Sequence, residues 1–220
     1  MTVTELAHFH TQTGDYPREL QQLASLAIKA QDKWCAENLS KTTGYMSDGT
    51  VARGLGNPGA LLLTAHWDSP EQHKQWIDSD VNKDIMPRLG EFLDMSKLLF
   101  YHVDDVAPFT CRPSPESHAF VPNTVIVSRY FVPKARKRAF GAAMKELMSR
   151  EGQDGKSIAT CAWRIEKGEA MERDGIEELN VVVAGCGNNI SDYSKITNAS
   201  YFKTILGDFR EETHLYQKML

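Results

Sequence analysis

The chain has 220 residues and a formal net charge of −4, and 41% of its residues are hydrophobic, 25% charged and 9% aromatic. A chain of this length and composition can bury a globular core without disulfides or metal ions. Lysine and arginine are spread along the chain, no stretch approaches ~18 apolar residues, and the first residues lack the pattern of a signal peptide. These features argue against nucleic-acid and membrane partners, and they predict a cytoplasmic protein.

The first half of the chain alternates between strand and helix patterns. Between Pro17 and Trp34, apolar residues recur at steps of three and four, which is typical of an amphipathic helix. Asp68 or Ser69 can accept a hydrogen bond from a free backbone amide, and Pro70 suits a first helical position, so a helix is expected to start there. The expected elements are a strand at residues 3–10, a helix at 17–34, a short strand within 44–59, a strand at 60–67, helices at 68–76 and 80–94, and a strand at 98–103.

A proline-rich segment separates this half from the next. Four of the nine prolines lie at residues 104–122, where no periodicity is evident. The sequence therefore predicts a linker at residues 107–122 between a first region, 1–106, and a second region, 123–220. The second region is expected to contain a strand at 124–132, a helix at 133–150, strands at 157–165 and 178–186, a helix at 191–209 and a strand at 214–219.

The same order of elements thus occurs twice. Strand, helix, strand, strand, helix, strand is the ferredoxin-like βαββαβ unit, whose antiparallel sheet carries both helices on one face. The other face is left apolar, and two such sheets can cover each other. We therefore predict the fold class α+β, with two tandem ferredoxin-like repeats packing sheet to sheet as a fused dimeric α+β barrel.

The segment from His66 to Trp76, HWDSPEQHKQW, carries a family resemblance. It resembles the antibiotic-biosynthesis-monooxygenase family, in which an aromatic residue at a strand end precedes a Ser-x-Glu helix start and a downstream His and Trp. The second region lacks this motif. The superfamily that the segment resembles includes cofactor-free oxygenases, polyketide cyclases, isomerases, haem-degrading enzymes and proteins without known activity. The resemblance therefore implies the dimeric α+β barrel fold and does not choose the chemistry.

Histidines on the predicted strands of the first region are the main candidates for chemistry. They are His8, His10, His66 and His102. Side chains two apart on a strand share a face, so His8 and His10 point the same way and could lie near His66. Imidazoles titrate near neutral pH and can exchange protons with a substrate. We predict His66 as the central base, the other three as its partners, and Tyr45 or Tyr101 as a phenolic donor.

Other residues are assigned to the walls of a site or to the surface. The predicted pocket wall consists of the aromatic residues Trp34, Trp67, Trp76, Phe92 and Phe100. Arg129 and Arg164 could hold a carboxylate or enolate oxygen, although a structural salt bridge is the preferred reading of both. His73 is expected on the exposed side of a helix, as a surface residue.

We expect no metal and no cofactor. The chain has no helical HExxH or HxxxH pattern, and its glycine-rich segment at residues 54–59 precedes a strand rather than opening a helix. The resemblance implies a cofactor-independent acid–base enzyme of secondary metabolism that cyclises or isomerises a polyketide-like or aromatic small molecule. The alternatives are a cofactor-free monooxygenase of a phenolic or anthrone substrate, and a non-catalytic ligand-binding or assembly module. The expected partner is a small-molecule substrate, and a homodimer is allowed for.

Overall fold

The computed structural model describes residues 2–39, 50–57, 59–104, 106, 124–151, 157–185, 203–204 and 207–219. Within the chain, contacts define two compact units. The first unit contains Met1–Asp105 together with Tyr216–Leu220, and the second contains Val106–Leu215. The predicted linker at residues 107–122 lies outside the described residues.

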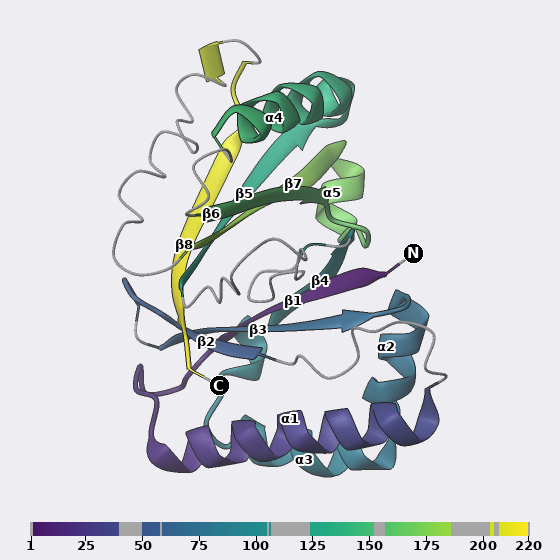
Figure 1. Cartoon of the computed structure of the whole chain (residues 1–220), viewed down its shortest axis with the longest axis vertical. Coiled ribbons are helices and arrows are strands. Elements are labelled where there is room, and N and C mark those ends of the chain that lie inside the picture. Colours follow the sequence, from purple (N-terminus) through teal and green to yellow (C-terminus); the bar gives the residue numbers. More distant parts are fainter. Residues whose placement is uncertain are drawn as a thin grey trace, which may run out of the picture. The chain divides into compact units, whose positions relative to one another are not determined.

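The first unit is a ferredoxin-like repeat (Figure 1). Its elements are β1 (Val3–His10), α1 (Arg18–Asn38), β2 (Thr50–Gly54), β3 (Ala60–Trp67), α2 (Pro70–Ile77), α3 (Asp80–Gly90), the 3-10 helix η1 (Met95–Lys97) and β4 (Leu99–Asp104). The strand order β4-β1-β3-β2 is antiparallel throughout. This is the order that a βαββαβ unit produces. The last residues of the final strand, β8 (Arg210–Lys218), pair with β2.

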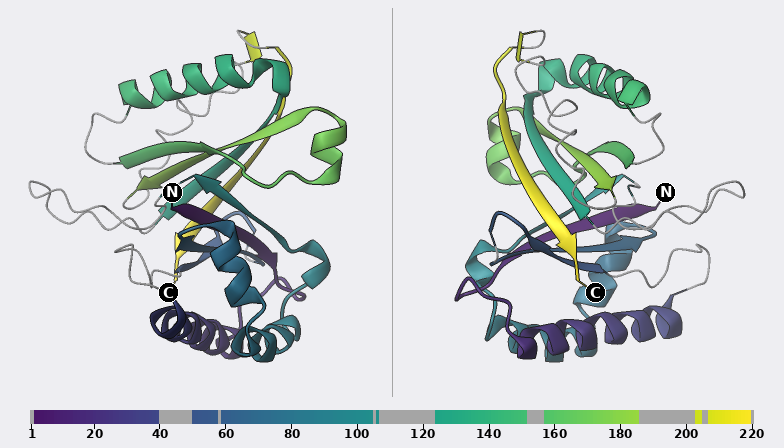
Figure 2. Two further views of the ribbon diagram at one scale, coloured as in Figure 1. Left: turned by 90° about the vertical axis from the view of Figure 1, so that its right-hand side faces the viewer. Right: turned by 60° about the vertical axis from the view of Figure 1, so that its left-hand side comes forward.

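Helices α1 and α3 lie side by side along one face of this sheet (Figures 1 and 2). Leu20 and Leu23 of α1 are buried against Leu89 of α3 in a core that also contains Leu61 of β3. The apolar stripe of α1, visible in the sequence, therefore faces the sheet as an amphipathic helix should. The two short helices α2 and α3 replace the single long helix of the simplest βαββαβ unit, and each begins at a serine cap.

The register of the strands separates the side chains of the first sheet into two faces. Glu5 is opposite both Ala65 of β3 and His102 of β4, so these residues share the face that α1 and α3 cover. His8 is opposite Leu62, on the other face. Because side chains alternate along a strand, Tyr101 also lies on the His8 face while Phe100 lies with His102.

The second unit repeats this topology. Its elements are β5 (Thr124–Pro133), the 3-10 helix η2 (Lys134–Arg136), α4 (Lys137–Glu151), β6 (Ser157–Trp163), the short α5 (Glu169–Arg173), β7 (Ile176–Gly185) and residues 210–215 of β8. The order β8-β5-β7-β6 is again that of a ferredoxin-like repeat. Phe140 and Met144 of α4 are fully buried against Tyr130 of β5, and they form the core of this unit.

The predicted fold class, α+β with tandem ferredoxin-like repeats, is confirmed. Several boundaries differ from the sequence expectation; among them, β8 starts at Arg210 rather than at His214, and β7 starts at Ile176 rather than at Glu178. Near its start each strand carries a charged side chain that forms a salt bridge, Glu177 in β7 and Glu212 in β8, so an apolar pattern alone places the starts too late. Most of the predicted helix at residues 191–209 lies outside the described residues. In the described part of the chain, no helix is long and apolar enough to cross a membrane.

Candidate active site

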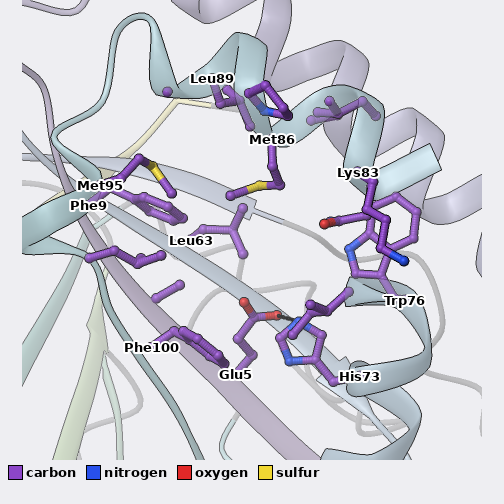
Figure 3. Close-up of a pocket in the computed structure, with 18 residues that line it drawn as sticks. Glu5, Phe9, Leu63, His73, Trp76, Lys83, Met86, Leu89, Met95 and Phe100 are labelled. Carbon is purple, nitrogen blue, oxygen red and sulfur yellow. Dashed lines mark ion pairs between the residues drawn. The ribbon is translucent and has the colours of Figure 1, made fainter. Parts of the chain in front are cut away.

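A cavity of about 610 Å³ opens in the first unit between the helix-covered face of the sheet and helices α2 and α3 (Figure 3). Its wall is mostly apolar. The lining residues on the strands include Glu5, Ala7, Phe9, Leu63 and Phe100, and those on the helices and the following turn include His73, Trp76, Lys83, Met86, Leu89 and Met95. A pocket of this size and polarity suits a small, largely apolar molecule.

A carboxylate faces this apolar space. Glu5 is only 6% exposed, and its carboxylate lies between the cavity and His73 (Figure 3). The indole Nε1 of Trp67 donates a hydrogen bond of 3.0 Å to Oε2 of Glu5. Nε2 of His73 lies 3.4 Å from the same oxygen. A buried carboxylate is tolerated when hydrogen-bond donors surround it, and these two rings supply such donors.

His73 links this carboxylate to a second buried imidazole. Its Nδ1 lies 2.8 Å from Nε2 of His102. The ring of His73 is stacked on Trp67, with centroids 4.5 Å and planes 13° apart, and Phe100 meets it edge-on at 5.9 Å. These contacts hold the ring of His73 through one stacked and one edge-on aromatic neighbour and at both nitrogens. Glu5, His73 and His102 therefore form a continuous polar chain, which we call the Glu5–His73–His102 chain.

The start of α2 places His73 in this chain. The Ser69 hydroxyl caps the helix by accepting from the amide of Gln72, and Pro70 is its first residue. His73 follows one turn later, and its amide donates to the carbonyl of Ser69. Because residues three and four apart share a helix face, the imidazole of His73 points to the same side as Trp76, toward the sheet. The prediction that His73 is a surface residue is wrong, since the residue is only 4% exposed.

The strand register disperses the histidines that the sequence grouped. His66 is opposite Thr4, whereas His8 is opposite Leu62 and His10 is opposite Ala60. His66 and His8 thus share a face but are separated by four residues along the sheet, about 13 Å at the usual rise per residue. His102 lies on the other face. The predicted cluster around His66 is therefore not assembled, because antiparallel pairing runs the two strands in opposite directions.

His8 has phenolic neighbours instead. Its Nδ1 lies 3.0 Å from the hydroxyl of Tyr216, and its Nε2 lies 3.3 Å from the hydroxyl of Tyr101. All three side chains are buried. Tyr101 is thus close to a histidine, as the sequence suggested, but on the face of the sheet opposite the cavity. Tyr45 lies outside the described residues.

The predicted aromatic wall is partly in place. Trp76 and Phe100 line the cavity, and Trp67 is buried behind Glu5 and His73. The ring of Trp34 packs on Trp76 at 5.6 Å, so Trp34 supports the wall from behind. Phe92 is partly buried and packs against the core under α1 and α3.

Arg129 and Arg164 form salt bridges in the second unit. Arg129 contacts Glu178 at 2.7 Å and Glu212 at 2.7 Å, and Arg164 contacts Glu178 at 3.1 Å. Burial by itself would raise the pKa of Glu178, but the hydrogen bonds and charges of Arg129 and Arg164 together hold it below its ordinary value. The arginines therefore have the structural role that the sequence analysis preferred. They lie on the central strand β5 and just beyond β6, so the bridge is not confined to a sheet edge.

Glu5 is a residue that sequence reasoning missed as a candidate acid–base group. Alternation along β1 turns it away from His8 and His10, and the same alternation turns it toward the cavity. A charged residue within a strand of otherwise buried residues was the available signal. In the described part of the chain, no group of three or more His, Cys, Asp or Glu side chains is arranged to hold a metal ion.

Comparison with known proteins gives similarity at the level of fold. No known protein family matches the sequence, and no curated protein matches it. Among solved structures, an anthrone oxidase-like protein is 12% identical with a TM-score of 0.63, and the match covers 100% of this chain and 92% of that one. A monooxygenase candidate from Lactobacillus acidophilus is 10% identical with a TM-score of 0.60, covering 99% and 93%. A haem-binding protein from Thermus thermophilus is 12% identical with a TM-score of 0.54, covering 100% and 92%.

These matches extend over both repeats, and they place the chain in the dimeric α+β barrel fold. The last of them raises the question of haem. An axial ligand needs an imidazole nitrogen directed into the cavity. Among the described lining residues the only histidine is His73, whose Nδ1 faces His102 and whose Nε2 faces Glu5. These residues do not fit haem ligation in this cavity.

Proposed function

We propose that the chain is a cofactor-independent enzyme that removes a proton from an apolar aromatic small molecule bound in the cavity of the first unit. The observation that carries this proposal is the Glu5 carboxylate, buried at the edge of an apolar cavity and backed by His73. A general base must lie within hydrogen-bond reach of the proton that it takes, and Glu5 faces the space where a substrate fits.

The cavity also suits the anion that proton removal produces. Lys83, at the cavity wall on α3, is the only cation among the described lining residues. Its ammonium group donates to the carbonyl of Asp78 at 2.6 Å, which holds it near the opening. A substrate with a phenolic oxygen toward Lys83 and an acidic C–H toward Glu5 would be bound at both ends. The apolar wall between them, which includes Trp76 and Phe100, favours aromatic rings.

Oxygenation is the favoured fate of this anion, because two of the similar folds are described as an anthrone oxidase-like protein and a monooxygenase candidate. Glu5 takes a proton from a CH₂ group, and the resulting carbanion transfers one electron to O₂. The superoxide and the carbon radical combine to a peroxide, which receives the proton held by Glu5. Loss of the second hydrogen as a proton breaks the O–O bond and gives a ketone and water. One CH₂ group and one O₂ thus become one C=O group and one water, without flavin or metal.

Isomerisation or cyclisation, the leading expectation from the sequence, is the second candidate. The observation that favours it is the pairing of a proton acceptor, Glu5, with a potential donor, His73, at one site. Such a pair can remove a proton from one atom and return it to another. The binding-module alternative requires the same cavity without turnover. The predicted homodimer and the cytoplasmic location remain predictions.

Product analysis with an anthrone and a β-dicarbonyl polyketide, in air and without oxygen, tests the proposal. In buffer free of flavin and metal we expect ketone formation in air, and a loss of ~10²–10⁴-fold for Glu5→Gln, which keeps the side-chain shape but removes the base. His66→Ala is the matched control, because His66 lies on the other face of the sheet. Turnover that persists without oxygen would favour the isomerase or cyclase. Loss of activity in His66→Ala but not in Glu5→Gln would overturn the assignment of the base.

A further inference from the structure

His102 is part of the Glu5–His73–His102 chain but does not line the cavity. It is 3% exposed, and it is not among the described residues that line the cavity. Its ring stands nearly perpendicular to that of His73, at an interplanar angle of 82° with centroids 5.0 Å apart. This geometry directs Nε2 of His102 at the edge of His73, where Nδ1 lies at 2.8 Å. Any effect of His102 on a substrate must therefore pass through His73.

Within the Glu5–His73–His102 chain, the donor or acceptor role of each imidazole nitrogen determines the role of the next. A neutral imidazole has one N–H donor and one acceptor nitrogen. If His73 carried its proton on Nδ1, the lone pair of Nε2 would face the Glu5 carboxylate at 3.4 Å, and two acceptors would confront each other in a buried site. The arrangement that suits an ionised Glu5 has the His73 proton on Nε2. Nδ1 of His73 then accepts, and Nε2 of His102 donates to it.

We infer that His102 is a positioning residue that fixes His73 in the tautomer with its proton on Nε2. By this donation His102 keeps the N–H of His73 directed at Glu5, and so holds the Glu5 carboxylate in the orientation of the base. This inference rests on the proposed function. The logic is that of a base held by a partner which is itself oriented by a third group.

The contacts of His102 make this role separable from packing. Phe100 and Trp67 hold the ring of His73 in place by stacking and edge contacts that do not involve His102. Replacing His102 should therefore leave the position of His73 largely unchanged, but the proton of His73 would no longer be fixed on Nε2. Glutamine retains an amide donor at about the place of Nε2, whereas methionine fills a similar volume without any donor.

Two measurements on wild type, His102→Gln and His102→Met test the inference. The first is the ¹⁵N NMR spectrum of the histidine-labelled protein, with His73→Gln to assign the signals. The second is the rate at which a bound anthrone forms its coloured anion without oxygen. We expect the wild type and the Gln variant to show the Nε2–H tautomer of His73 and similar rates. We expect the Met variant to show a mixed tautomer and a rate lower on the order of tenfold to a hundredfold, with KM unchanged, short of the ~10²–10⁴-fold loss of an acid–base group itself.

The outcomes separate this inference from the proposed function. A Met variant that keeps both the wild-type rate and the wild-type tautomer overturns the inference alone. Equal losses in the Gln and Met variants also overturn it, because a donor would then not rescue. A wild type that forms no anion with any substrate overturns the proposed function, and with it the catalytic role of His102. If the Met variant does not fold, as judged by circular dichroism, His102→Asn replaces it, since the shorter amide cannot reach Nδ1.

Discussion

The indole of Trp67 contacts both His73 and Glu5 of the Glu5–His73–His102 chain: its ring stacks on His73 at 4.5 Å, and its Nε1 donates to Glu5 at 3.0 Å. The end of β3 and the first turn of α2 are therefore joined to β1 through one side chain. In the sequence, Trp67 and His73 belong to the segment that carries the family resemblance. Their structural role gives that segment a physical meaning, because it supplies the two rings that contact the Glu5 carboxylate.

Trp67→Phe separates these two functions. Phenylalanine keeps an aromatic ring against His73 but removes the donor to Glu5, so a buried carboxylate loses one of its hydrogen bonds. We expect a free energy of unfolding lower by about 1–3 kcal/mol and a reduced rate of proton removal. Urea denaturation and anion-formation kinetics measure the two effects. Trp34→Phe is the control, since the ring of Trp34 contacts Trp76 and is not part of the Glu5–His73–His102 chain. Equal effects of both variants on the rate would contradict the role given to the indole N–H.

Two serine caps provide a matched pair. Ser69 caps α2, which carries His73, and Ser79 caps α3 by accepting from the amide of Asn82. Each Ser→Ala change should lower the free energy of unfolding by about 1 kcal/mol. Only Ser69→Ala should also reduce turnover, because it loosens the turn that positions His73. Comparable turnover in the two variants would argue that the start of α2 does not control the site.

Narrowing the cavity should discriminate between substrates by size. Met86 lines the cavity wall on α3, and a tryptophan there would occupy space that a fused ring system needs. We expect Met86→Trp to weaken binding of a tricyclic anthrone by about tenfold or more, equivalent to about 1.4 kcal/mol, and to affect a single-ring phenol less. Fluorescence titration measures both affinities. Leu26→Trp on the exposed face of α1 is the control. Unchanged anthrone affinity in Met86→Trp would show that the substrate binds elsewhere.

The Glu178 salt bridges predict acid sensitivity of the second unit. Because the pKa of Glu178 is lowered in the folded protein, its contribution to stability is present above the ordinary glutamate pKa and is lost as the pH falls through the lowered value. Glu178→Gln should cost about 3–5 kcal/mol at neutral pH, since Arg129 and Arg164 lose their buried partner. Urea denaturation between pH 7 and pH 3 should then show a shallower pH dependence than in wild type. Glu172→Gln, at an exposed position, should leave the profile unchanged. If the free energy of unfolding of Glu178→Gln depended on pH as steeply as that of wild type, Glu178 would not be the source of the acid sensitivity.

The fold was predictable because its signals are local. Hydrophobic periodicity identified α1, the cap at Ser69 identified α2, and the repeated order of elements identified two ferredoxin-like units. Alternation also correctly placed His8 and His10 on one face of β1.

The site was less predictable because it depends on register and on helix rotation. The sequence does not show that Thr4, and not His8, is opposite His66. Nor does it show that α2 turns His73 toward Glu5 rather than toward solvent. A pattern of residues gives a face, but only the pairing of strands and the packing of α2 decide which groups meet on it.

The rate of anion formation from an anthrone without oxygen, measured in wild type and in Glu5→Gln, shows most directly whether Glu5 is the base. It isolates proton removal from every later step. The account predicts a coloured anion that forms rapidly in wild type and ~10²–10⁴-fold more slowly in Glu5→Gln, while affinity for the anthrone is retained. Equal rates in the two proteins would contradict the role of Glu5 as the base, because the proton would then be taken by another group.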